Sequence, residues 1–216
     1  NAVDISGGAG GDDIRGDVVS GGRVKVGNGN GQPKIYGNIN YSDEPCDNCR
    51  DRIISGSGGK VNQINGIESA PAINGIVRTQ ISEAKSDNDN GPAPFSGDTI
   101  TGSVELSAGT YYLERIDVAD SETVTLNTTD GNIYLGVEEY VHLGTGSTFE
   151  VVGDGTVSVY VRGTSGATND LELDANSQIT NAGDDAPQFR VFGQDNFTAL
   201  IGDGSNGDLA KYVGVI

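Results

Sequence analysis

The sequence predicts an all-β fold, namely a single-domain parallel β-helix (β-solenoid) with one short flanking α-helix. Between Thr99 and Gly163, apolar residues lie two apart in short sets, which is the period of strands with one inward face. The breaks between the sets carry Gly, Asp, Asn, Ser and Thr, which favour turns. Gly accounts for 34 of the 216 residues, which disfavours a helical bundle, while the apolar alternation disfavours disorder.

Residues 1–45 are the predicted first coils of the solenoid. An Ile-x-Gly-x-(Val/Ile) pattern places an apolar residue on each side of a Gly, as the corner of a stacked coil requires. The copies are Ile14/Gly16/Val18, Ile35/Gly37/Ile39 and Ile100/Gly102/Val104. The first two copies are separated by about one solenoid coil, on the order of 20 residues.

Residues 42–60 form an irregular loop in this interpretation, and the loop contains Cys46 and Cys49. A zinc site of this spacing needs a second pair of ligands, and the chain has no other Cys and only His142. A small disulfide between the two cysteines is the most economical account, and it implies an oxidising compartment.

Residues 69–86 are the one predicted helix. Ser69 suits the cap and Pro71 the first turn. The apolar residues at helical spacing are Ile73, Ile76, Val77 and Ile81. We expect the helix to pack on the side or end of the solenoid and to cover apolar strand edges, with docking onto a partner as the alternative.

Residues 99–216 are the predicted main solenoid, so that residues 1–216 form one domain. The strand-forming sets are Val104/Leu106, Ile116/Val118, Val124/Leu126, Ile133/Leu135/Val137, Val141/Leu143, Phe149/Val151, Val157/Val159/Val161, Leu171/Leu173, Ile179, Phe189/Val191 and Leu200/Ile201. The sequence shows no linker between two domains, no secretion signal and no membrane-spanning segment.

The charge balance restricts the partners. Thirteen basic residues against 31 acidic ones give a net charge of −18, which repels nucleic acid and anionic lipid. This charge favours a host that lives in high salt, where repulsion is screened; an ordinary acidic secreted protein is the alternative. Glycosylation acceptors at Asn40, Asn127 and Asn196, together with the predicted disulfide, indicate an extracellular or cell-surface location.

Several segments carry a family resemblance. They are Leu106-Ser-Ala-Gly-Thr-Tyr-Tyr-Leu113, Val124-Thr-Leu126, Asn132-Ile-Tyr-Leu135, Gly155-Thr-Val-Ser-Val-Tyr-Val161, Pro187-Gln-Phe-Arg-Val-Phe-Gly193, Gly214-Val-Ile216 and the helix end at residues 83–90. In these segments the chain is similar to haloarchaeal secreted β-solenoid surface proteins related to the C-terminal domain of pilus-assembly minor-pilin-like proteins. The resemblance implies a solenoid-like β domain outside the cell, usually behind an amino-terminal membrane or pilin-like segment. The family supplies no established catalytic residues.

Candidate chemical sites are few. Asp12 and Asp13 lie in one copy of a calcium nonapeptide and are the candidate calcium ligands; no cofactor is otherwise required. His142 lies between two inward residues, so we expect it to be a lone surface histidine. The acidic groups that could serve a glycan-cleaving β-helix are Glu138/Glu139, Asp170/Glu172/Asp174 and Asp184/Asp185. The tyrosines that could stack on sugar are Tyr111, Tyr112, Tyr134, Tyr140 and Tyr160.

The favoured function is a non-catalytic structural or adhesive protein of the cell surface of a halophilic archaeon, with end-to-end or filament self-association as in a pilus-like subunit. Open solenoid ends offer a physical route to such polymers. The alternative is a polysaccharide-binding or polysaccharide-degrading β-helix protein, for which surface glycans are the partner. A viral fibre segment, which would form trimers, is a third hypothesis.

Overall fold

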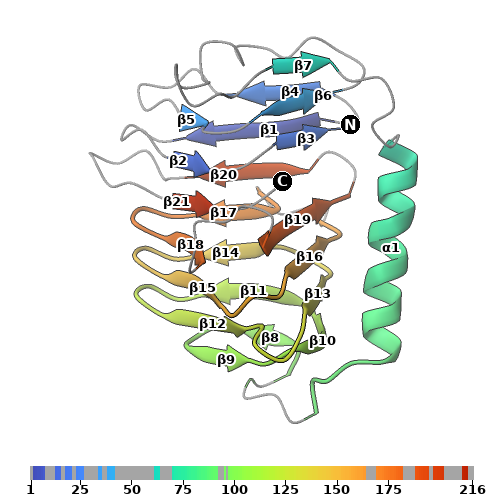
Figure 1. Cartoon of the computed structure of the whole chain (residues 1–216), viewed down its shortest axis with the longest axis vertical. Coiled ribbons are helices and arrows are strands. Elements are labelled where there is room, and N and C mark those ends of the chain that lie inside the picture. The colour runs from blue at the N-terminus through green and yellow to red at the C-terminus, as the bar shows by residue number, and fades with distance from the viewer. Residues whose placement is uncertain are drawn as a thin grey trace.

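The computed structural model describes residues 2–7, 13–15, 18–20, 23–26, 34–35, 38–41, 61–63, 70–91, 95, 97–163, 169–181, 188–194, 197–201 and 211–213. Within these residues the fold is a parallel β-helix with one flanking helix, as the sequence predicts (Figure 1). The predicted loop at residues 42–60, with Cys46 and Cys49, lies outside the described residues.

The strands form three faces, and the chain visits them in the same order from β1 to β6 and again from β8 to β21. Face A contains β1 (Ala2–Gly7), β4 (Arg23–Val26), β8 (Thr99–Ile100), β11 (Arg115–Val118), β14 (Val141–Leu143), β17 (Leu171–Leu173) and β20 (Thr198–Ile201). Face B contains β2 (Asp13–Arg15), β5 (Lys34–Ile35), β9 (Val104–Leu106), β12 (Thr123–Asn127), β15 (Thr148–Val152), β18 (Gln178–Asn181) and β21 (Lys211–Val213).

The third face is made of two separate sheets. One contains β10 (Gly109–Leu113), β13 (Ile133–Val137), β16 (Val157–Val161) and β19 (Phe189–Gly193). The other contains β3 (Val18–Ser20), β6 (Ile39–Tyr41) and β7 (Val61–Gln63). All pairings between neighbouring coils are parallel and in register, so equivalent residues of successive coils stack in columns.

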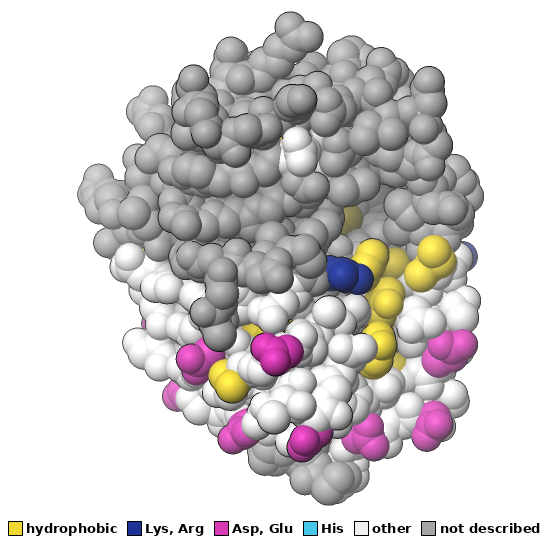
Figure 2. Space-filling model, viewed as in Figure 1, with side chains coloured by type: hydrophobic (Ala, Val, Ile, Leu, Met, Phe, Trp, Pro, Cys, Tyr) yellow, Lys and Arg dark blue, Asp and Glu magenta, His cyan; other side chains and the backbone are white. Residues whose placement is uncertain are grey.

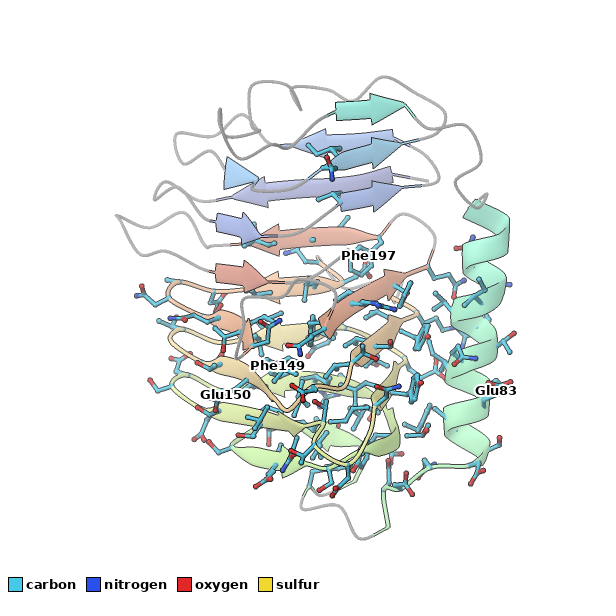
Figure 3. The ribbon with its side chains drawn as sticks, in the orientation of Figure 1. Glu83, Phe149, Glu150 and Phe197 are labelled. Carbon is cyan, nitrogen blue, oxygen red and sulfur yellow. The ribbon has the colours of Figure 1, made fainter. Side chains whose placement is uncertain are left out.

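The core is the column of inward side chains predicted from the alternation. Between Val104 and Val161 every predicted inward residue is buried, and Phe149 lies inside the stack while its neighbour Glu150 points outward (Figure 3). One prediction is wrong in β20, where Ala199 and Ile201 are buried and Leu200 points away from the core. The period of two forces this choice, because adjacent residues cannot share one face of a strand.

The two amino-terminal copies of the repeat behave as predicted. Ile14 pairs with Ile35, and Val18 pairs with Ile39, so the two copies are one coil apart. The third copy occupies a different corner, because Ile100 lies on face A and Val104 on face B. A five-residue pattern of this kind marks a corner without specifying which one.

The order of the coils differs from the prediction. The coils of residues 1–45 are not the start of the stack, because β1 pairs with β20 and β2 pairs with β21. The carboxy-terminal coils are therefore continued by the amino-terminal ones. Between these two parts of the chain, α1 (Ala70–Ser86) runs along the side of the stack and returns the chain to its opposite end (Figure 1).

Helix α1 confirms the predicted helix almost to the residue, and it packs on the side of the solenoid. Val77 and Ile81 are buried as predicted, and Ala84 extends the buried stripe. Ile76 is 48% exposed, which corrects its assignment to the buried face. The buried residues Val77, Ile81 and Ala84 are four and three positions apart and share one face of the helix, to which Ile76 does not belong. No helix in the described part of the chain is long and apolar enough to cross a membrane.

The turns between faces A and B stack as a column of their own. Ser121, Gly146 and Asn176 occupy the third position of three successive turns, with φ values of 63°, 70° and 60°. The N–H of Ser121 donates to the carbonyl of Thr145 in the next coil, at 2.9 Å. This left-handed conformation suits Gly and Asn better than Ser.

The end of the stack at β10 is covered by the segment that follows α1. Asp89 exchanges bonds with Thr110, whose carbonyl accepts from the Asp89 N–H at 2.8 Å and whose N–H donates to the Asp89 carboxylate at 2.9 Å. Asn90 donates to the Tyr112 carbonyl and accepts from its N–H, at 2.5 and 3.1 Å. Phe95 packs against the core below Tyr111, with ring centroids 6.3 Å apart. On the third face this solenoid end is therefore not an open strand edge.

Candidate functional site

The outward residues of the third face form two columns. One column consists of Tyr112, Gly136, Tyr160 and Phe192, and the other consists of Thr110, Tyr134, Ser158 and Arg190. Helix α1 lies over the first column, where Val77, Ile81 and Ala84 form an apolar cluster with Tyr112. The second column runs beside the helix.

Gly136 sets how closely the helix approaches the sheet. A Cβ at this position would lie 3.0 Å from the Cβ of Ala84 and 3.2 Å from the Cα of Ile81. A side chain here would push the helix outward, so the absence of one allows α1 to sit directly on β13. The helix then stands between two flanks of different chemistry.

One flank of α1 forms a groove of about 470 Å³ across β10, β13 and β16. Its lining includes Gln80, Glu83, Asp87, Thr110, Tyr134 and Tyr160. Figure 2 shows a strip of hydrophobic side chains along the boundary between the solenoid and the helix, with acidic side chains scattered elsewhere on this side. The groove combines aromatic and polar side chains.

The two tyrosines of the groove differ in exposure and in how firmly their rings are held. Tyr134 is 37% exposed, and its hydroxyl accepts from the Asn132 side-chain amide at 3.3 Å. Tyr160 stacks on Phe192, with centroids 5.0 Å apart and planes 14° apart, so its ring is held in place. Burial raises the pKa of Tyr160, which keeps the phenol neutral. The groove thus offers one accessible ring and one fixed ring.

The carboxylates of the groove come from the last turns of α1. Glu83 accepts a bond from Gln80 at 2.8 Å, and Figure 3 places Glu83 on the helix. Asp87 follows the helix directly and donates its N–H to the Glu83 carbonyl at 2.9 Å. The carboxyl end of a helix dipole is itself negative. Anionic ligands are therefore disfavoured in this groove.

The opposite flank of α1 is a smaller, cationic hollow of about 370 Å³. Arg162 donates to Glu138 at 2.8 Å, and Lys85 lies 4.0 Å from the same carboxylate and 4.9 Å from the Tyr112 ring centre. Glu139 turns to Arg115 instead, at 3.7 Å. The predicted pair Glu138/Glu139 is therefore divided between two ion pairs, and its members do not face a common substrate.

His142 is not the lone surface histidine that the sequence suggests. Its side chain is 28% exposed, and its Nδ1 and Nε2 lie 2.8 Å from Asp117 Oδ1 and 3.1 Å from Asp174 Oδ2. Because both partners are carboxylates, both contacts are hydrogen bonds when the two ring nitrogens carry protons. Burial lowers the pKa of His142, but the bonds to Asp117 and Asp174 outweigh it and the pKa is raised. The ring ties three coils together.

The predicted carboxylate group Asp170/Glu172/Asp174 borders β17, and each member has its own bond. Asp170 accepts from the Thr198 N–H at 2.7 Å, and burial raises its pKa despite this bond. Glu172 accepts from Asn169 at 3.2 Å, and Asp174 holds His142. These bonds hold neighbouring segments and coils together, and these three carboxylates do not form a facing pair of nucleophile and acid. Asp184/Asp185 lies outside the described residues.

The other predicted tyrosines are used structurally. Tyr111 is buried and donates to the Ser107 carbonyl at 3.0 Å, and Tyr112 is buried under α1. Tyr140 stands on face A, with its hydroxyl 3.4 Å from Asp117. Only Tyr134 and Tyr160 of the predicted set line the groove. The sequence alone did not predict that α1 forms the other wall of the groove. The Gly within Ile133-Tyr-Leu-Gly-Val137 could have indicated it, because a Gly on the outward face of a strand lets a helix approach closely.

The remaining predicted sites are largely outside the described part of the chain. Asp12, Cys46, Cys49 and Asn196 are not described, and for Asp13 and Asn40 only the strand backbone is. Asn127 donates to Glu105 at 2.9 Å, so a glycan there would replace this bond. The described residues hold no group of three or more His, Cys, Asp or Glu side chains arranged for a metal ion.

The fold and the groove together define a β-helix domain with a groove beside its flanking helix. In comparison with known families, residues 56–216 match the family described as "Domain of unknown function (DUF7305)". The chain belongs to this family. No curated protein matches the chain.

Proposed function

We propose that this protein is a non-catalytic, extracellular structural or adhesive domain of the cell surface, adapted to high salt. The proposal rests on the hydrogen bonds that outward-facing carboxylates make within the stack. On face A and at its corners, Asp117, Asp170 and Asp174 each bond to another segment of the stack. A surface whose reactive groups hold coils together suits a rigid scaffold better than a catalyst.

The charge supports the high-salt part of the proposal. A net charge of −18 on a compact rod creates strong self-repulsion at low ionic strength. At 1 M salt the screening length falls to about 3 Å, which removes most of this cost. We expect the melting temperature to rise with NaCl concentration. An unchanged melting temperature between dilute and concentrated salt contradicts the adaptation.

The covered end of the stack at β10 restricts how such a domain would assemble. Asp89 and Asn90 satisfy the outer edge of β10, so strand addition at that position would have to displace them. We therefore favour lateral contacts or attachment to a surface over growth through this edge. Filament and pilus-like assembly remain part of the proposal through the other faces.

Electron microscopy in concentrated salt, alongside sedimentation, tests the structural role. Regular filaments or larger assemblies support it. A monodisperse monomer at all salt concentrations removes the self-associating version and leaves adhesion through a ligand. A glycan-cleaving enzyme is the competing class, and turnover of a polysaccharide that the triple variant Asp170→Asn, Glu172→Gln, Asp174→Asn abolishes would overturn the non-catalytic proposal.

A further inference from the structure

We propose that the groove between α1 and the third face binds a segment of a neutral glycan chain. This inference rests on the proposed adhesive function and names the partner for it. The groove lies on the flank of α1 that Tyr134 and Tyr160 share with Gln80, Glu83 and Asp87. Its volume of about 470 Å³ falls within the range of small-ligand sites, about 300 to 1,000 Å³.

The two tyrosine rings of the groove, Tyr134 and Tyr160, are suited to stacking on a sugar. Tyr134 is among the most exposed large hydrophobic residues described, although nothing in the stacking of the coils requires a ring there. Tyr160 is immobilised by Phe192, so it loses little freedom when a ligand packs on it. Rings with an apolar face and a polar edge suit a ligand that is itself apolar on one side and hydroxylated at its rim.

The polar side chains that line the groove can hydrogen-bond to sugar hydroxyls. Gln80, Thr110 and Ser86 are uncharged donors and acceptors, and Glu83 and Asp87 are strong acceptors for hydroxyl groups. Sugar hydroxyls need both kinds of group. The same carboxylates, at the negative end of the helix dipole, repel uronate and sulfated chains. The groove therefore disfavours acidic glycans, and its rings and uncharged groups suit neutral sugars.

The shape of the groove suits an extended chain. Thr110, Tyr134 and Tyr160 come from three successive strands, so the groove extends over about 10 Å along the stack. Gly136 and Ala84, which meet where the helix contacts the sheet, line the groove without long side chains. A hollow that follows α1 in this way accommodates a piece of a chain lying parallel to the helix.

The test measures binding of defined hexasaccharides to the whole chain by calorimetry and NMR. The neutral probes are cellohexaose, maltohexaose and N-acetylchitohexaose; the charged probes are a galacturonate hexamer and a chitosan hexamer. We expect at least one neutral probe to bind and to shift the Tyr134 and Tyr160 resonances. Tyr134→Ala should weaken that binding by about tenfold, and Tyr134→Trp should retain it.

Val152→Ala is the matched control. Val152 is as exposed as Tyr134, at 38% against 37%, but lies on face B away from α1. The Val152→Ala variant should bind the glycan as wild type does. Circular dichroism should show that both variants fold. Binding of no neutral probe, binding of the chitosan hexamer alone, or equal binding by Tyr134→Ala and wild type overturns the inference. None of these outcomes affects the microscopy of assemblies, so the two proposals fail separately.

Discussion

Gly136 points outward from β13 on the third face, and His142 points outward from β14 on face A, six positions further along the chain. Gly136 is covered by Ala84 and Ile81 of α1, whereas His142 lies between two carboxylates at the protein surface. Both residues stand on the same kind of parallel strand, with buried neighbours on either side. Their surroundings differ because the third face has a helix over it, whereas no helix of the described residues covers face A at His142.

The difference shows two ways of stabilising the outside of a solenoid. Under α1, stability comes from burying apolar area, which contributes about 25 cal/mol per Å². On face A it comes from bonds between coils, and exposed charged pairs contribute about 1 kcal/mol or less. The covered face should therefore respond strongly to changes in volume. The bare face should respond weakly to volume and measurably to pH.

Ile81→Ala should give the largest effect. Ile81 is 3% exposed and lies at the centre of the contact between α1 and the sheet. Removing its buried methyl and methylene groups should lower the free energy of unfolding by about 3 kcal/mol, with increased hydrogen exchange along α1. Ile76→Ala is the control, since Ile76 is 48% exposed on the same helix. It should change stability by about 0.5 kcal/mol or less. Equal losses in both variants would mean that the helix does not depend on this face.

Gly136→Ala should have the next largest effect and tests the spacing between helix and sheet. The added Cβ meets Ala84 at 3.0 Å and the Ile81 backbone at 3.2 Å, so the helix must move outward. We expect a loss of about 2 kcal/mol in urea unfolding. Gly102→Ala is the control, because its nearest neighbour would be Glu122 at 3.9 Å. If Gly136→Ala is as stable as Gly102→Ala, the close approach of α1 is wrong.

The sequence predicted what depends on local periodicity. The inward residues of β9 and of β11 to β16, and the extent of α1, follow from spacings of two and of 3.6, and the structure confirms them. The period cannot show which face a strand occupies, so it does not reveal that the Ile100 copy marks a different corner from the Ile14 and Ile35 copies. It also cannot show which coils are neighbours when a helix carries the chain from one end of the stack to the other, as happens between β7 and β8.

The candidate site was less predictable, for a related reason. The groove needs α1 beside β13, and the His142 bridge needs Asp117 and Asp174 from the coils on either side. These contacts join residues some 25 to 55 positions apart, through a register that depends on the length of every intervening turn. Residue types alone suggested Tyr134 and Asp174 among many equivalents. Only the stacking distinguishes them from Tyr111 and Glu172.

His142→Gln should have a smaller effect that depends on pH. The raised pKa means that the folded state favours the imidazolium, so its contribution is fully present below about pH 6.5 and is lost as pH rises through the folded value. At pH 5.5 we expect the variant to be less stable than wild type by about 1 kcal/mol, since the ring is partly exposed. Above the folded pKa the difference should shrink.

The pKa itself can be measured directly, because His142 is the one histidine among the 216 residues. Its ring resonances should titrate above about pH 6.5, and Asp117→Asn should move the midpoint downward. Tyr140→Phe is the control, since it removes a hydroxyl near Asp117 without changing charge. A midpoint at or below the ordinary value would contradict the double carboxylate bridge.

Ser121→Asn should give the smallest effect, and in the opposite direction. Ser121 holds φ at 63° in a column of turns where the equivalent residues are Gly146 and Asn176. Asn tolerates this conformation better than Ser, so we expect a gain of about 0.5 kcal/mol in the free energy of unfolding. Ser107→Asn, at an exposed position that is not among the residues with positive φ, should give no gain. Because the corner borders face A and not α1, the gain should add to the loss from Ile81→Ala without coupling. Non-additivity would show that the corner and the helix-covered face do not respond independently.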